Sequence, residues 1–153
     1  SFMKQSPFIA ADGCVGLQFF QSKMPMILAS VEKKQIKLWG YKYDQQPKLT
    51  HRFHCKSEII DFTISPITNF LYFLTEEGRM FIINKKGDFI TNLDHQTEKF
   101  CSITYYEDMI YVGTFTGNLI VYPSSSMIQK ELLDFPMKLK QSFNLSNSET
   151  KES

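Results

Sequence analysis

Residues 71–83 read LYFLTEEGRMFII, and this stretch decides the fold. Two apolar runs, residues 71–74 and 80–83, enclose a polar segment that contains Gly78. Short runs rich in aromatic and β-branched residues favour strands, and glycine supplies the positive φ that a tight turn needs. The stretch therefore predicts a β-hairpin.

The same 13-residue pattern occurs twice more, as ILASVEKKQIKLW over residues 27–39 and as IYVGTFTGNLIVY over residues 110–122. The three segments start 44 and then 39 residues apart. Gly117 supplies the turn of the third hairpin, whereas Glu32 to Gln35 contains no glycine. We therefore expect the first turn to be looser than the other two.

A strand-like segment lies on each side of every hairpin. Residues 15–22, 59–65 and 100–106 precede the hairpins, and residues 48–55, 89–94 and 128–135 follow them. Four short strands in roughly 40–45 residues are typical of a propeller blade. The sequence predicts an all-β chain with three four-stranded antiparallel β-propeller blades, over 15–55, 59–95 and 100–135, as part of a larger propeller. Because residues 70–74 are apolar on both faces, we expect the middle unit to be packed on both sides.

Two motifs resemble the WD-repeat β-propeller family in a degenerate form. Residues 27–30 (ILAS) followed by 36–39 (IKLW) are similar to a small-residue strand and the closing apolar-Trp strand of that family, and residues 62–66 (FTISP) resemble its strand ending in Ser-Pro. Gly40 stands where the family has Asp after Trp39, and no Gly-His dipeptide occurs. The resemblance implies a non-catalytic scaffold for protein–protein interaction within a larger complex.

Three blades are fewer than the roughly 4–8 of a closed propeller. We expect a fragment of a longer propeller, whose remaining blades are then partners, or a ring completed by a second copy or a partner chain; a β-sandwich or barrel is the alternative fold. Residues 1–14 are interpreted as a tag remnant plus one strand, and residues 136–153 as a disordered polar tail or linker.

Charge and cysteine content narrow the class of protein. Lys plus Arg is 17 and Asp plus Glu is 16, so a net charge of +1 argues against a general coating of nucleic acid. No apolar stretch approaches the roughly 20 residues of a membrane helix. Three widely spaced cysteines do not form a secreted disulfide framework, and we expect a cytoplasmic or nuclear protein.

No catalytic, metal-binding or cofactor-binding residues are predicted. His51, His54 and Cys55 form the only His/Cys cluster, and residues three apart on a strand point to opposite faces. Asp61 and Glu107 lie on or beside presumed inner strands, without further acidic groups that would line a catalytic channel. We expect no enzymatic activity.

The predicted partner-binding residues lie in the three hairpin turns. They are Phe115, Lys33, Lys34, Glu76 and Glu77. An aromatic side chain at a loop tip is a good interface anchor. The alternative function is binding of nucleic acid or phosphoinositide by the lysines of the first unit, at positions 23, 33, 34, 37, 42 and 48.

Overall fold

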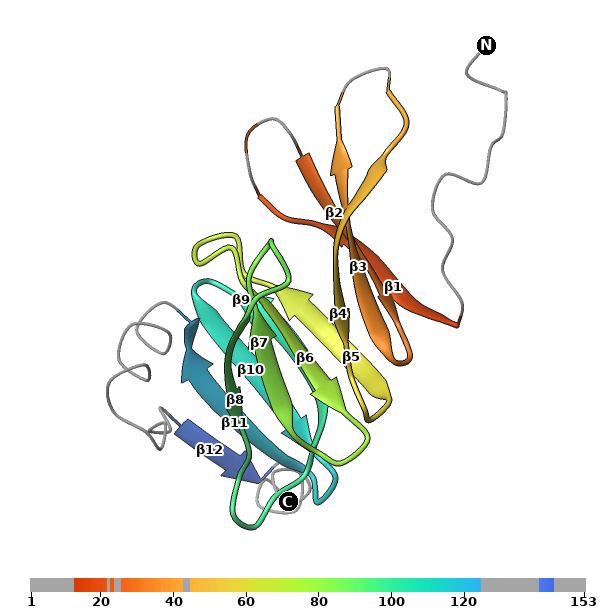
Figure 1. Cartoon of the computed structure of the whole chain (residues 1–153). Helices are drawn as coiled ribbons and strands as arrows, with labels where there is room; N and C mark the ends of the chain where they lie inside the picture. The colour runs from red at the N-terminus through yellow and green to blue at the C-terminus, as the bar shows by residue number, and fades with distance from the viewer. Residues whose placement is uncertain (1–12, 22, 24–25, 43–44, 125–140, 145–153) are drawn as a thin grey trace.

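The computed structural model describes residues 13–21, 23, 26–42, 45–124 and 141–144. They form three four-stranded antiparallel sheets, which we call blades 1, 2 and 3 (Figure 1). Blade 1 holds β1 (Cys14–Phe19), β2 (Met26–Glu32), β3 (Gln35–Tyr41) and β4 (Lys48–His54). Blade 2 holds β5 (Ile59–Ile64), β6 (Leu71–Thr75), β7 (Met80–Ile83) and β8 (Phe89–Leu93). Blade 3 holds β9 (Phe100–Tyr106), β10 (Met109–Thr114), β11 (Asn118–Pro123) and β12 (Gln141–Asn144).

The predicted all-β fold of propeller blades is confirmed. The strands of blades 1 and 2 lie side by side in chain order, and blade 3 follows the same order from β9 to β12. Each first strand carries a β-bulge near its start, for example between Cys14 and Gly16 in β1 and between Ile59 and Asp61 in β5. No helix long and apolar enough to cross a membrane occurs among the described residues.

The last strand of blade 3 begins later than we expected. The segment 128–135 lies outside the described residues, whereas Gln141–Asn144, which we placed in the polar tail, pairs with β11. An outer strand needs only the unpaired backbone groups at the edge of its neighbour, so polar sequence is compatible with it. Composition therefore misled us about these four residues.

The core consists of two apolar layers, one between each pair of adjacent blades. On β6, Leu71 and Phe73 belong to the layer shared with blade 1, and Tyr72 and Leu74 belong to the layer shared with blade 3. All four side chains are fully buried. The expectation that this strand is packed on both faces is confirmed, because adjacent β-strand residues point to opposite faces and both faces are covered.

The first hairpin turn is tight, contrary to our expectation. Only Lys33 and Lys34 separate β2 from β3, and the Val31–Ile36 pair continues the ladder up to the turn. The Gln35 amide donates a hydrogen bond to the Glu32 carboxylate at 3.1 Å, which closes the turn through side chains. No residue of this turn has a positive φ, so a glycine is not needed here.

Candidate functional site

The five predicted partner-binding residues occupy equivalent hairpin turns of the three blades. In blades 2 and 3 the turns have the same backbone geometry: the amides of Gly78 and Gly117 donate to the carbonyls of Thr75 (2.9 Å) and Thr114 (3.1 Å). Both glycines have positive φ, +83° and +87°, which favours glycine at these positions. We call the three turns, residues 33–34, 76–78 and 115–117, the turn row.

Backbone hydrogen bonds between blades join the turn row into one surface. The Ile59 amide donates to the Lys33 carbonyl at 2.6 Å, and the Phe100 amide donates to the Gly78 carbonyl at 3.0 Å. The turns of blades 1 and 2 thus each accept the first amide of the next blade. The segments that lead into β5 and β9 also pair with the hairpin turn of the blade that they enter. For example, the Phe115 amide donates to the Lys99 carbonyl at 3.0 Å.

Side chains strengthen the same links. Ser57 donates a hydrogen bond to the Glu77 carboxylate, and Thr116 and Asn118 donate to the Glu98 carboxylate. The hydrogen bond from Thr116, followed by that from Asn118, lowers the pKa of Glu98. The Glu77 carboxylate is thus already engaged by Ser57 within the chain.

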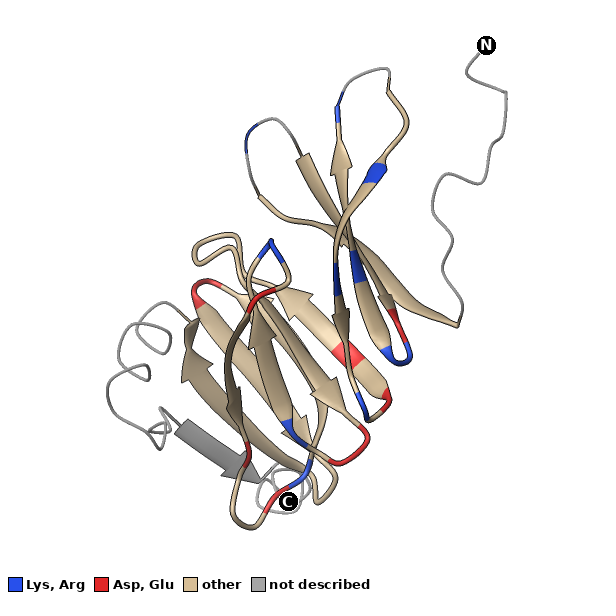
Figure 2. Ribbon diagram, viewed as in Figure 1, with Lys and Arg blue, Asp and Glu red and all other residues tan. Residues whose placement is uncertain are grey.

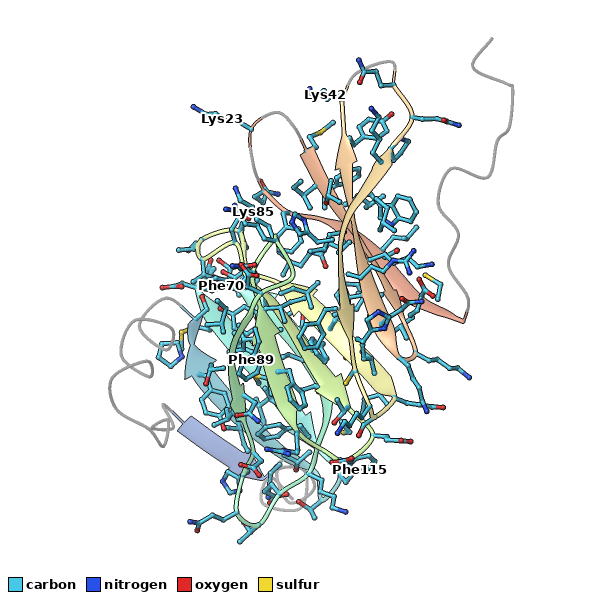
Figure 3. All side chains as sticks on the ribbon, viewed as in Figure 1. Lys23, Lys42, Phe70, Lys85, Phe89 and Phe115 are labelled. Atoms are coloured by element: carbon cyan, nitrogen blue, oxygen red, sulfur yellow. The ribbon has the colours of Figure 1, made fainter. Side chains whose placement is uncertain are left out.

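Phe115 stands out from the turn row as its apolar tip. Its side chain is 64% exposed, and its backbone is fixed by the bond to Lys99 (Figure 3). Lys33 and Lys34 are also exposed. A hollow of about 490 Å³ beside them is lined by both lysines and by Glu32 and Glu58 among others, so its charges are mixed. The structure thus brings the predicted residues into one row of fixed turns with an exposed aromatic side chain.

The lysines of the first unit do not form one surface. Lys37 pairs with the buried Glu32 carboxylate at 3.1 Å, and Lys33 and Lys34 lie in the turn row. Lys23 and Lys42 lie at the opposite end of the blade, in the loops between β1 and β2 and between β3 and β4 (Figures 2 and 3). The fold therefore separates the lysines that the sequence suggested as a nucleic-acid or phosphoinositide interface.

Sequence reasoning missed a second group of lysines. Lys85 and Lys86 lie in the β7–β8 turn, at the same end of the blades as Lys23 and Lys42. The sequence signal was present, since Lys85-Lys86-Gly87 is a turn that points away from the turn row in a four-strand meander.

The side chains considered as catalytic or metal-binding candidates include Asp61 and the cysteines. Asp61 accepts the backbone amides of Phe62 and, across the blade boundary, Ile103, both at 2.9 Å. Burial raises the pKa of the Cys55 thiol, and the three cysteines are free. Within the described part of the chain, no three His, Cys, Asp or Glu side chains converge as metal ligands would.

One hydrogen bond accompanies the WD-like motif of blade 1. The Trp39 indole donates to the Ser30 hydroxyl at 2.9 Å, and both residues are buried. It joins the strand that contains Ser30 to the closing Trp strand.

Among the comparisons with known proteins, the solved structures bear on the fold. No protein-family model matches the sequence, and no curated protein matches it. Among solved structures, apo AztD from Citrobacter koseri aligns with a TM-score of 0.59 and 15% identity over 83% of this chain and 34% of its own. A chain of apo ctPRC2 in an autoinhibited state aligns with a TM-score of 0.60 and 11% identity, covering 77% of this chain and 29% of its own.

BamB from Moraxella catarrhalis aligns with a TM-score of 0.52 and 14% identity, over 70% of this chain and 32% of its own. These neighbours are β-propeller-type proteins, and the described chain consists of three β-propeller blades. The chain spans about a third of the length of the structures that it matches.

Proposed function

We propose that this chain is a non-catalytic, WD-repeat-like scaffold that binds protein partners in a larger complex through its turn row. The observation that carries the proposal is the exposed Phe115 on a turn held by fixed backbone bonds. A rigid aromatic tip loses little conformational entropy on binding, which favours its use as an interface anchor. The hollow beside Lys33 and Lys34, with both signs of charge, suits the polar rim of such an interface.

The assignment to WD-like repeats is supported by the buried Trp39–Ser30 hydrogen bond. A non-catalytic role is supported by Asp61, whose carboxylate binds backbone amides. The free cysteines support a reducing compartment, the cytoplasm or the nucleus.

The test is site-specific photocrosslinking in cells with a photoreactive phenylalanine analogue at position 115. The matched control carries the analogue at Tyr106, which is 62% exposed but lies on β9, away from the turn row. We expect discrete protein adducts from position 115 and none of the same size from position 106. Phe115→Ser should abolish binding of the identified partner while the melting temperature stays unchanged. Identical adducts at both positions, or none at position 115, would contradict the proposal.

A further inference from the structure

The outer edge strands of blades 1 and 2 differ in charge. The last strand of blade 1, β4, carries four exposed lysine, arginine or histidine side chains: Lys48, His51, Arg52 and His54. The last strand of blade 2, β8, reads FITNL and contains neither a charged residue nor proline. Charged side chains and proline are the usual means by which an edge strand avoids pairing with another chain. The edge of β4 is therefore protected in this way, whereas the edge of β8 is not.

The edge of β8 offers backbone groups to a further strand. Among the described strands, β8 pairs only with β7, from Met80 opposite Leu93 to Ile83 opposite Phe89. Within the described part of the chain, the backbone N–H and C=O groups along its other edge therefore have no strand partner. Such an edge binds an extended segment through main-chain hydrogen bonds, because the segment continues the sheet as a fifth strand.

An exposed aromatic side chain stands at this edge. Phe89 begins β8 and is 53% exposed (Figure 3). Its ring contacts Phe81 of β7, with centroids 6.5 Å apart, and Phe81 stacks on the buried Phe73 at 5.4 Å. Phe73 packs edge-on against Phe53 of blade 1 at 5.7 Å. Phe89 is thus the exposed end of the apolar layer between blades 1 and 2, and an apolar side chain bound to it would extend that layer.

The start of β8 is held in place before any partner binds. The β7–β8 turn packs closely on β4, since a Cβ placed on Gly87 would lie 3.4 Å from the Arg52 carbonyl oxygen. The Asn84 side-chain carbonyl accepts the backbone amides of Lys86 and Asp88, both at 2.9 Å. A preformed edge loses little conformational entropy when a segment pairs with it.

Charge at the ends of β8 argues against a second copy of the chain on this edge. Asp88 and Asp94 directly precede and follow the strand, and both are exposed. The register that pairs all of β8 with β8 of a second copy is centred on Thr91 and places each Asp88 opposite the Asp94 of the other copy. Like charges directly opposite each other destabilise a strand pair. A segment of another protein that carries no carboxylates avoids this repulsion.

We propose that the outer edge of β8 binds an extended segment of a partner protein, apolar at alternate positions and free of acidic residues, which adds to blade 2 as a fifth strand. Main-chain hydrogen bonds supply the affinity, and Phe89 selects an apolar side chain on the face toward blade 1. The proposal goes beyond the proposed function, because it assigns a second surface. The turn row contains no residue of β8, so either proposal can fail without the other.

The experiment measures fluorescence anisotropy of a labelled, uncharged peptide of alternating valine and threonine, flanked by glutamines for solubility. The variant is Phe89→Lys. The matched control is Tyr106→Lys, which makes the same charge change at a 62% exposed aromatic side chain of β9. We expect the affinity to fall at least about tenfold in Phe89→Lys and less than about twofold in Tyr106→Lys, because a lysine protects the edge and removes the aromatic contact.

Two further measurements test the strand pairing itself. The same peptide with N-methyl groups on all of its backbone nitrogens keeps its side chains but has no main-chain donors, and it should not bind. Amide hydrogen exchange with and without the unmodified peptide should slow in β8 and stay unchanged in β4.

Equal losses in the two variants, binding of the N-methylated peptide, or no binding of the unmodified peptide to the wild type would overturn the proposal. Protection confined to β4 or to the turn row would do the same. A dimer of the free chain that Phe89→Lys dissociates would overturn it in favour of a second copy on this edge. If Phe89→Lys does not melt cooperatively, Phe89→Thr replaces it, with an expected fall in affinity of about threefold. An unchanged affinity would then count against the site.

Discussion

Blades 1 and 2 have the same strand order and the same early bulge, but their equivalent faces differ. The face of blade 2 that packs on blade 1 includes Ile64, which is 2% exposed. The residue at the same place in blade 1 is Phe19, 46% exposed, and its neighbour Leu17 is 56% exposed. Strand pairing alone therefore does not determine which side chains are buried; the next sheet in the stack does.

The central positions of the two faces differ in a second way. Blade 2 places Phe73 opposite Phe81 on this face, with ring centroids 5.4 Å apart. Blade 1 places Ser30 opposite Lys37 at the same positions, and these side chains bind Trp39 and Glu32. A face between two sheets is filled with apolar side chains, whereas the face of blade 1 pairs its polar groups internally.

The largest expected effect compares the free energy of unfolding after the same Leu→Ala substitution on each of the two faces. Leu71→Ala in the layer between blades 1 and 2 should lower the free energy of unfolding by about 2–5 kcal/mol, because it leaves a cavity in a fully buried site. Leu17→Ala should cost less than about 0.5 kcal/mol. Urea unfolding of both variants measures the comparison. Similar losses would mean that the exposed face of blade 1 is covered in solution.

The polar pairing in blade 1 should matter less than the apolar layer. Ser30→Ala removes the acceptor of the buried Trp39 indole N–H and should cost about 1–3 kcal/mol. Ser102→Ala, at an exposed position of β9, serves as the control and should be neutral. A neutral Ser30→Ala would show that the hydrogen bond does not contribute to stability.

The contact of Asp61 across the second blade boundary should contribute less still. Asp61→Ala removes the acceptor of the Ile103 amide at a half-buried site and should cost about 1 kcal/mol. Asp61→Asn keeps one acceptor oxygen and should recover part of that loss. Thermal unfolding of the three proteins tests this order, and an equal effect of both substitutions would point to charge rather than to the hydrogen bond.

The smallest expected effect is a pH dependence at Glu98, which lies before β9 and accepts a hydrogen bond from Thr116 of the turn row. Its pKa is lowered in the folded state, mainly by the hydrogen bond from Thr116, so its contribution is present above the ordinary glutamate pKa of about 4.3. The contribution is lost as the pH falls through the lowered folded-state pKa. The melting temperature of Glu98→Gln should be below that of the wild type at pH 7, and the difference should disappear in acid. A difference that is constant with pH would exclude ionisation of Glu98 as its cause.

Much of the fold could be predicted from the sequence, because the hairpin segments carry their own turn and strand signals. Gly78 and Gly117 occupy the positions of positive φ that the pattern predicted. The fourth strand of blade 3 could not be predicted, since Gln141–Asn144 pairs through backbone groups and carries little apolar pattern. The tight first turn was also missed, because this turn contains no residue of positive φ and so carries no glycine signal.

Individual residues of the candidate site could be predicted from the sequence, but the surfaces that they form together could not. Phe115 could be placed at a turn tip from the hairpin pattern alone. The strand order of a meander already implies that loops alternate between its two ends, whereas the ion pair of Lys37 with Glu32 is seen only in the structure. The link between Lys33 and Ile59 requires the relative position of two sheets, which no local pattern encodes.

The bonds from the turns of blades 1 and 2 to the first amide of the next blade have a consequence for how the chain unfolds. Each bond joins adjacent blades, Lys33 with Ile59 and Gly78 with Phe100, so the array is connected mainly through nearest neighbours. In such an array, opening starts at the ends and proceeds one unit at a time. Amide hydrogen exchange should therefore be slowest in β6, with Phe73 among its most protected amides, and should become faster toward both outer sheets.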